Sequence, residues 1–159
     1  MWQSAIKLNT AMTTIPFSGT APAMTDLIGG QVDIMCDQTT NTTKQIQGGT
    51  IKAYAVTSAD RLPVLPDVPT AAEGGLNDFQ VGIWHGVYTP KGTPAEAIEK
   101  LNVSLKKALK DENVVARFAE LGTAPSPDSD VTSAALKAKL EGEIARWKPV
   151  IEAAGQYAD

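Results

Sequence analysis

The residues with the clearest chemical potential lie in a short turn, residues 18–23. A β-branched stretch (residues 12–17) precedes this turn and a helical pattern (residues 23–28) follows it. The first N–H groups of a helix have no intrahelical acceptor, and the helix dipole adds positive potential there, so such a turn favours an anion such as a carboxylate. Pro22 has no N–H. The candidate ligand-binding residues are therefore those with a free amide or hydroxyl: Ser18, Gly19, Thr20, Ala21 and Ala23. A plain strand-to-helix turn is the alternative.

A second polar segment follows the apolar stretch at residues 32–36. In a parallel sheet, residues beyond the carboxyl ends of the strands line the ligand crevice. Every residue from 36 to 43 can form a side-chain hydrogen bond, a longer polar run than a helix cap needs. The alternative is a solvated turn that caps a helix. The candidate ligand-binding residues in this segment are Asp37, Gln38, Thr39 and Thr40.

A cysteine hydrolase is a third interpretation, with Cys36, His85 and Asp37 as its catalytic residues. Nothing in the sequence places His85 beside Cys36, and a lone cysteine in an apolar segment is usually a small buried hydrophobe. The chain has one Cys and one His, which excludes multi-cysteine metal sites and every motif that needs two histidines. We therefore expect no catalysis, no metal and no cofactor.

The amino-acid composition further narrows the classes of protein to which this chain could belong. The 159 residues have a net charge of −4, with 43% hydrophobic and 20% charged residues. This composition is that of a globular domain and does not favour nucleic-acid binding, which needs a clustered basic surface. No apolar run is long enough to span a membrane. The first nine residues do not resemble a signal peptide, so an exported protein with this start would be a processed product or a fragment.

The pattern of elements predicts an α/β protein. Three short strands (12–17, 32–36 and 51–56) alternate with helices that end at Gly29–Gly30 and Gly48–Gly49, which argues for a parallel sheet. A proline-rich connector and an extended segment over residues 79–88 follow. The rest is predicted helical: a helix that starts in a Thr93–Glu96 capping box, a helix capped by Asp111, and a last helix with a kink or break near residues 145–148, before Pro149.

The two parts of the chain are unbalanced. Helices that pack on a sheet need strands beneath them, and only residues 79–88 are available to the helices after residue 90. This imbalance predicts that part of the sheet is supplied by a segment outside this sequence or by a second chain.

The stretch Ile15-Pro16-Phe17-Ser18-Gly19-Thr20-Ala21-Pro22-Ala23-Met24-Thr25-Asp26-Leu27 resembles a characteristic segment of the Bug family, the extracytoplasmic solute-binding proteins of tripartite tricarboxylate transporters. The resemblance continues through Gly29–Asp37, Gly49–Ser58, Leu65–Thr70 and Pro90–Pro94 to Arg146-Trp147 and Gly155. It covers essentially the whole chain. It implies a type II periplasmic binding protein fold of two α/β lobes, with a small dicarboxylate, tricarboxylate or acidic amino acid between them.

The resemblance also implies where each part of this chain lies in the two-lobe fold of the family. The family is about twice as long, so residues 1–83 would be most of the second lobe and residues 84–159 the mainly helical return to the first lobe, whose remainder is absent. The turn at residues 18–23 and the segment Asp37–Thr40 would face the ligand. The implied setting is the bacterial periplasm and the implied partners are membrane transporter subunits; self-association through the exposed first-lobe surface is a further expectation. A ligand-sensing effector domain of a regulator is the alternative, although no helix-turn-helix is present.

Overall fold

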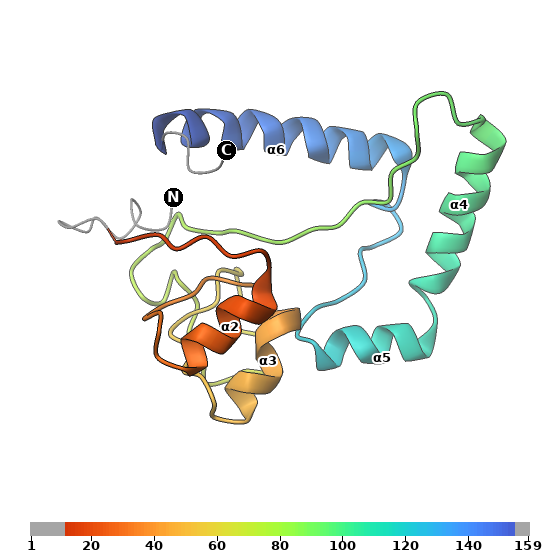
Figure 1. Ribbon diagram of the computed structural model, residues 1–159. Helices are drawn as coiled ribbons and strands as arrows, with labels where there is room; N and C mark the ends of the chain where they lie inside the picture. The colour runs from red at the N-terminus through yellow and green to blue at the C-terminus, as the bar shows by residue number, and fades with distance from the viewer. Residues whose placement is uncertain (1–11, 155–159) are drawn as a thin grey trace.

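The computed structural model describes residues 12–154. Five helices lie in this range, joined by long extended segments (Figure 1). In the described part of the chain no residue belongs to a β-ladder of two or more pairs. The one strand-like pairing there is an isolated parallel bridge between Val56 and Thr70.

The first two helices are α2 (Thr20–Ile28) and α3 (Thr39–Gln47). Both end in the same way. The N–H of Gly30 bonds to the Leu27 carbonyl and the next N–H bonds to the Asp26 carbonyl, with Gly30 at φ 70°. Gly49, at φ 68°, repeats this pattern at the end of α3. These are Schellman motifs, which need a residue in the left-handed region, so the predicted Gly-Gly helix ends are confirmed.

The proline-rich connector is fixed by a polar clip. The guanidinium of Arg61 donates to both carboxylate oxygens of Glu73 and to the Pro66 carbonyl. The carboxylate of Glu73 accepts from the Thr70 N–H, and the Thr70 hydroxyl accepts from the Glu73 N–H, which is a capping box. These bonds fix the connector, whose Leu65 and Val68 form a small buried cluster with Val56.

The remaining helices are α4 (Ala95–Ala108), α5 (Glu112–Glu120) and α6 (Ser133–Ala154), which form an open frame in Figure 1. Asp111 caps α5 as predicted, because its side chain accepts from the N–H groups of Asn113 and Val114. The predicted Thr93 capping box is wrong: the Thr93 hydroxyl donates to the Pro90 carbonyl instead. Of the kink or break predicted before Pro149, the break is wrong, since α6 continues through that residue.

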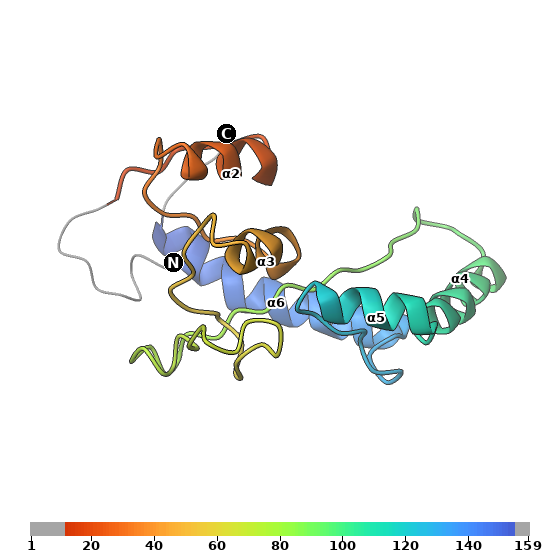
Figure 2. The same ribbon diagram turned by 90° about the horizontal axis from the view of Figure 1, so that it is seen from below.

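The extended segment 79–88 connects the part of the molecule that contains α2 and α3 to the later helices α4–α6. At its start, Thr57 and Val81 exchange two hydrogen bonds, and Arg146 of α6 donates to the Gln80 carbonyl at 2.7 Å. Further along, a Cβ on Gly86 would lie 2.9 Å from the Leu136 side chain. The segment therefore lies alongside α6, as Figures 1 and 2 both show.

The three predicted strands are not formed as strands. Residues 13–17, 34–36 and 52–55 have no regular secondary structure, and residues 32, 33 and 51 lie in bends. Of the segments 13–17, 32–36 and 51–56, only Val56 forms a bridge with another described residue. An extended segment becomes a strand only when a neighbour lies about 4.8 Å away in register. No described segment takes that place, so the structure has the helices of an α/β lobe without its hydrogen-bonded sheet.

Candidate functional site

The two predicted polar segments meet through one side chain. The amide of Asn41 donates to Thr20 Oγ1 at 3.3 Å and to Asp37 Oδ1 at 3.1 Å. Thr20 is the first residue of α2, and Asn41 lies in the first turn of α3. The bridge therefore holds the amino-terminal ends of the two helices side by side.

The start of α2 has main-chain donors with no acceptor among the described residues. Gly19 caps the helix without a side-chain hydrogen bond, and the N–H groups of Gly19, Thr20 and Ala21 bond to no atom in residues 12–154. A Cβ on Gly19 would meet nothing within 4 Å, so the space in front of this turn is open. The backbone here has the features predicted for an anion site, although the helix begins at Thr20 rather than at Ala23.

The start of α3 is similar. Gln38 is its N-cap and provides no side-chain cap, and the N–H groups of Thr39 and Thr40 find no acceptor in the described range. The Gln38 N–H is already used, because it donates to Asp37 Oδ1 at 2.6 Å. Asp37 therefore accepts bonds from both Gln38 and Asn41, and its carboxylate is oriented by α3.

A cavity of about 2250 Å³ lies beside this arrangement. It is lined by all four predicted residues from Asp37 to Thr40, and by Ala23 at the start of α2. The other four predicted residues, Ser18, Gly19, Thr20 and Ala21, do not line it. The structure thus joins the two predicted segments through Asn41, but the first residues of α2 are not part of the cavity lining.

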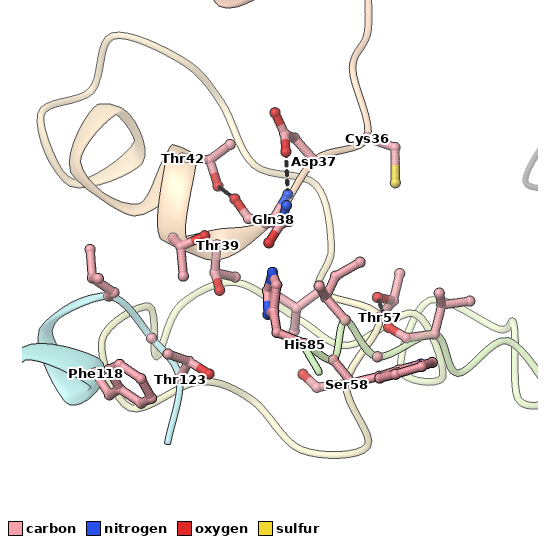
Figure 3. A pocket seen from close by; sticks show the side chains of 18 of the residues that line it. Cys36, Asp37, Gln38, Thr39, Thr42, Thr57, Ser58, His85, Phe118 and Thr123 are labelled. Atoms are coloured by element: carbon pink, nitrogen blue, oxygen red, sulfur yellow. Dashed lines mark hydrogen bonds between the residues drawn. The ribbon is translucent and has the colours of Figure 1, made fainter. Parts of the chain in front are cut away.

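The opposite wall of the cavity has polar side chains, of which the sequence analysis selected only His85, as a candidate catalytic residue of a hydrolase. Figure 3 shows the imidazole of His85 pointing toward Gln38 and Thr39, with Ser58 and Thr123 nearby. These residues come from three separate segments, so no local pattern could have grouped them. Asn41 was also missed; its only signal was its place in the polar run after residue 36.

The geometry does not support a thiol hydrolase. In Figure 3 the imidazole of His85 points toward Gln38 and Thr39 rather than toward the thiol of Cys36, and no hydrogen bond joins these two described residues. Although Cys36 is exposed by surface area, partial desolvation raises the pKa of its thiol, and the Asp37 carboxylate raises it further. A thiol with a raised pKa is a poor nucleophile near neutral pH.

Two other classes of site find no support within residues 12–154. No group of three or more potential metal-ligating side chains occurs there. None of the described helices is both long enough and apolar enough to cross a bilayer.

Known proteins of similar sequence and structure are solute-binding proteins. The family profile described as "Tripartite tricarboxylate transporter family receptor" (TctC) matches residues 1–156. A UPF0065 protein from the TAR-I ttuE-ttuC' intergenic region of Agrobacterium vitis is 53% identical over 149 residues, which are 94% of this chain and 43% of that protein.

Two solved structures are also similar. MatC from Rhodopseudomonas palustris with bound malate has a TM-score of 0.87 at 40% identity, covering 94% of this chain and 50% of that one. The periplasmic binding protein BugD has a TM-score of 0.88 at 48% identity, covering 97% and 50%. The chain therefore spans about half the length of each of these three proteins.

These similarities define the class: the chain has the fold of a periplasmic binding protein of the type II kind, not of an enzyme. The chain belongs to the tripartite tricarboxylate transporter receptor family. The resemblance to the Bug family that was predicted from the sequence is confirmed. Neither the hydrolase nor the regulator alternative finds support.

Proposed function

We propose that this chain forms the ligand-holding part of a receptor that captures a small carboxylate for a tripartite transporter. The observation that supports this most directly is the pair of helix amino termini joined by Asn41, with unused N–H groups on both. Two helix amino termini held next to each other favour a negative ligand near them. The similarity to MatC, which was solved with malate, makes a dicarboxylate the first candidate; tricarboxylates and acidic amino acids remain in the same class.

Each predicted residue has a distinct role in this proposal. The main chain of Gly19, Thr20 and Ala21, with the Ser18 hydroxyl, offers donors to one carboxylate. Ala23 is already the fourth residue of α2, so its N–H belongs to the helix and the residue contributes only to the cavity lining. The Thr39 and Thr40 amides and the Gln38 side chain offer donors to another part of the ligand. Asp37 cannot donate to a carboxylate. Its role is to orient Asn41, and its remaining acceptor capacity suits a ligand hydroxyl or ammonium group.

The same proposal extends to the lobes and the cellular setting. Residues 1–83 correspond to most of the second lobe and residues 84–159 to the helical return to the first, so that closure of the two lobes would complete the ligand cleft. We place this receptor in the periplasm, where it would hand its ligand to membrane subunits. Because one lobe supplies only part of the donors, this chain alone should bind a carboxylate weakly.

Weak binding is best measured by NMR. Titration of the ¹⁵N-labelled chain with L-malate should shift the amide signals of Gly19, Thr20, Ala21, Thr39 and Thr40 together, with one dissociation constant. Malate that left those signals unmoved at saturating concentration would contradict the proposal.

The Asn41 bridge supplies the matching variant. Asn41→Ala removes both bonds that join the helix ends, so the malate dissociation constant should rise several-fold, since hydrogen bonds of this kind are worth about 1 kcal/mol each. Asn77→Ala is the control, because Asn77 is an exposed turn residue that does not line the cavity. Equal affinities for the two variants would show that the bridge has no part in binding.

A further inference from the structure

One titratable side chain of the cavity has no part in the carboxylate site as proposed above. His85 is the one histidine of the chain, and it lines the cavity. Its imidazole points toward Gln38 and Thr39 (Figure 3), yet it forms no hydrogen bond or ion pair with any residue from 12 to 154. A polar side chain that faces a second polar wall and bonds to neither side is available to a ligand between them.

The segment that carries His85 is anchored before and after that residue. Before it, Thr57 and Val81 exchange hydrogen bonds of 2.7 and 3.2 Å. After it, Gly86 lies so close to α6 that a Cβ there would come within 2.9 Å of the Leu136 side chain. These contacts limit where the His85 imidazole can lie in the cavity.

The wall that His85 faces has main-chain donors without acceptors. The N–H groups of Thr39 and Thr40 bond to no described atom, and both residues line the cavity. They lie in the first turn of α3, where the helix dipole places positive potential that disfavours a protonated imidazole nearby. A carboxylate between the two walls reverses this balance, because it accepts from the α3 amides on one side and favours the imidazolium on the other.

We propose that His85 is a ligand-binding residue that selects for negative charge: across the cavity from Gln38 and Thr39, its imidazole donates to the ligand carboxylate and gains one proton as the ligand binds. This inference rests on the proposed function, because it concerns the same ligand. The proton comes from solvent, and no bond of the ligand is made or broken. Because the complex holds one more proton than the free chain, the affinity should fall as the pH rises, by at most about tenfold per pH unit.

Other charged and titratable side chains of the described residues line the same cavity. The charged ones are Asp33, Asp37, Asp130, Lys52 and Lys137, and the remaining titratable ones are Cys36, Tyr54 and Tyr88. Histidine is the side-chain type that ordinarily changes its charge between about pH 5 and 8. Desolvation and the Asp37 carboxylate raise the pKa of the Cys36 thiol, which moves it further above that range. A change in ligand affinity between pH 6 and pH 8 would therefore report on His85.

The experiment measures the binding of L-malate to the ¹⁵N-labelled chain, without a histidine tag, at pH 6 and at pH 8, where both malate carboxylates are ionised. The dissociation constant should be at least about threefold lower at pH 6. At pH 7 the imidazole signals, which belong to one residue, should move toward their protonated position as malate is added. Equal dissociation constants at the two pH values, or imidazole signals that bound malate leaves unmoved, would overturn the proposal.

A matched pair of variants assigns the effect to one side chain. His85→Gln keeps a donor but cannot take up a proton, so its malate dissociation constant should be the same at both pH values. Lys137→Gln removes another cation of the cavity lining, whose side chain is 75% exposed, and should keep the pH dependence of the parent chain. A His85→Gln protein that kept the pH dependence would overturn the proposal, and so would a Lys137→Gln protein that lost it.

The role of His85 and the proposed function fail in different ways. Malate that left the Thr39 and Thr40 amide signals unmoved at both pH values would contradict the proposed function, and the role of His85 with it. Malate that moved those signals with the same dissociation constant at both pH values would contradict the role of His85 alone.

Discussion

The sharpest test of the proposed anion site removes one main-chain donor without disturbing the helix. Thr39 is the first residue of α3, and its N–H has no acceptor among the described residues. Proline is well tolerated at this position because the missing N–H would be unpaired there. The preceding residue, Gln38, has φ −72° and ψ 144°, a conformation that a residue before proline prefers. Thr39→Pro should therefore fold as the parent chain does.

The expected loss follows from the type of bond. A hydrogen bond to a charged group is worth about 1.5–3 kcal/mol, so deletion of one amide donor should raise the malate dissociation constant by about tenfold to 150-fold. Thr39→Ala is the control, because it removes the hydroxyl and keeps the N–H. The carbonyl of Thr39, which accepts from the Thr43 hydroxyl at 2.8 Å, is kept in both variants.

The assay is an NMR titration with malate, accompanied by thermal unfolding of each variant. Thr39→Pro should bind much more weakly than Thr39→Ala, while the two variants unfold at similar temperatures. If the folded proline variant bound malate as tightly as the alanine variant, the Thr39 amide would not hold the ligand, and the reasoning from helix amino termini would fail at α3.

Two further predictions concern stability. The side chain of Arg61 and the Thr70 N–H lower the pKa of Glu73 from 4.5 to about 2. The contribution of the Glu73 carboxylate to stability is therefore complete above pH 4.5 and is lost as the pH falls toward 2. Glu73→Gln should flatten the pH dependence of the free energy of unfolding across that window, and an unchanged profile would contradict the role of the clip. Gly122 has φ +72°, and a Cβ there would lie 2.9 Å from a valine methyl, so Gly122→Ala should cost at least about 1 kcal/mol in a denaturant titration. Gly142→Ala should instead stabilise by about 1 kcal/mol, because that site in α6 is open; a destabilised Gly142→Ala would undermine the comparison.

The helices were predictable because their signals are local. The Gly-Gly ends of α2 and α3 and the Asp111 cap of α5 each depend on a few neighbouring residues, and all three formed as expected. Thr93 shows the limit of this logic: α4 begins at Ala95 with Pro94 as its N-cap, so Thr93 lies one residue too early to cap the helix.

The strands were not predictable to the same degree, because a strand depends on its neighbour. Residues 51–56 have the composition of a strand, yet of these only Val56 pairs with another described residue in a parallel bridge. Sequence patterns report that a segment prefers to be extended and half-buried, but not whether a partner lies beside it. The predicted imbalance between the two parts of the chain was the one sequence signal of this, and the open cavity is its structural counterpart.

The main-chain and side-chain groups of the site also differ in whether local sequence patterns can reveal them. Main-chain donors at the starts of α2 and α3 suit any carboxylate, because a backbone N–H does not distinguish one anion from another. Discrimination between carboxylates must then come from side chains, whose shape and charge can match one ligand better than another. Those on the far wall, His85, Ser58 and Thr123, converge from segments distant in sequence, so the part of the site that would select a ligand is the part that local sequence patterns could not reveal.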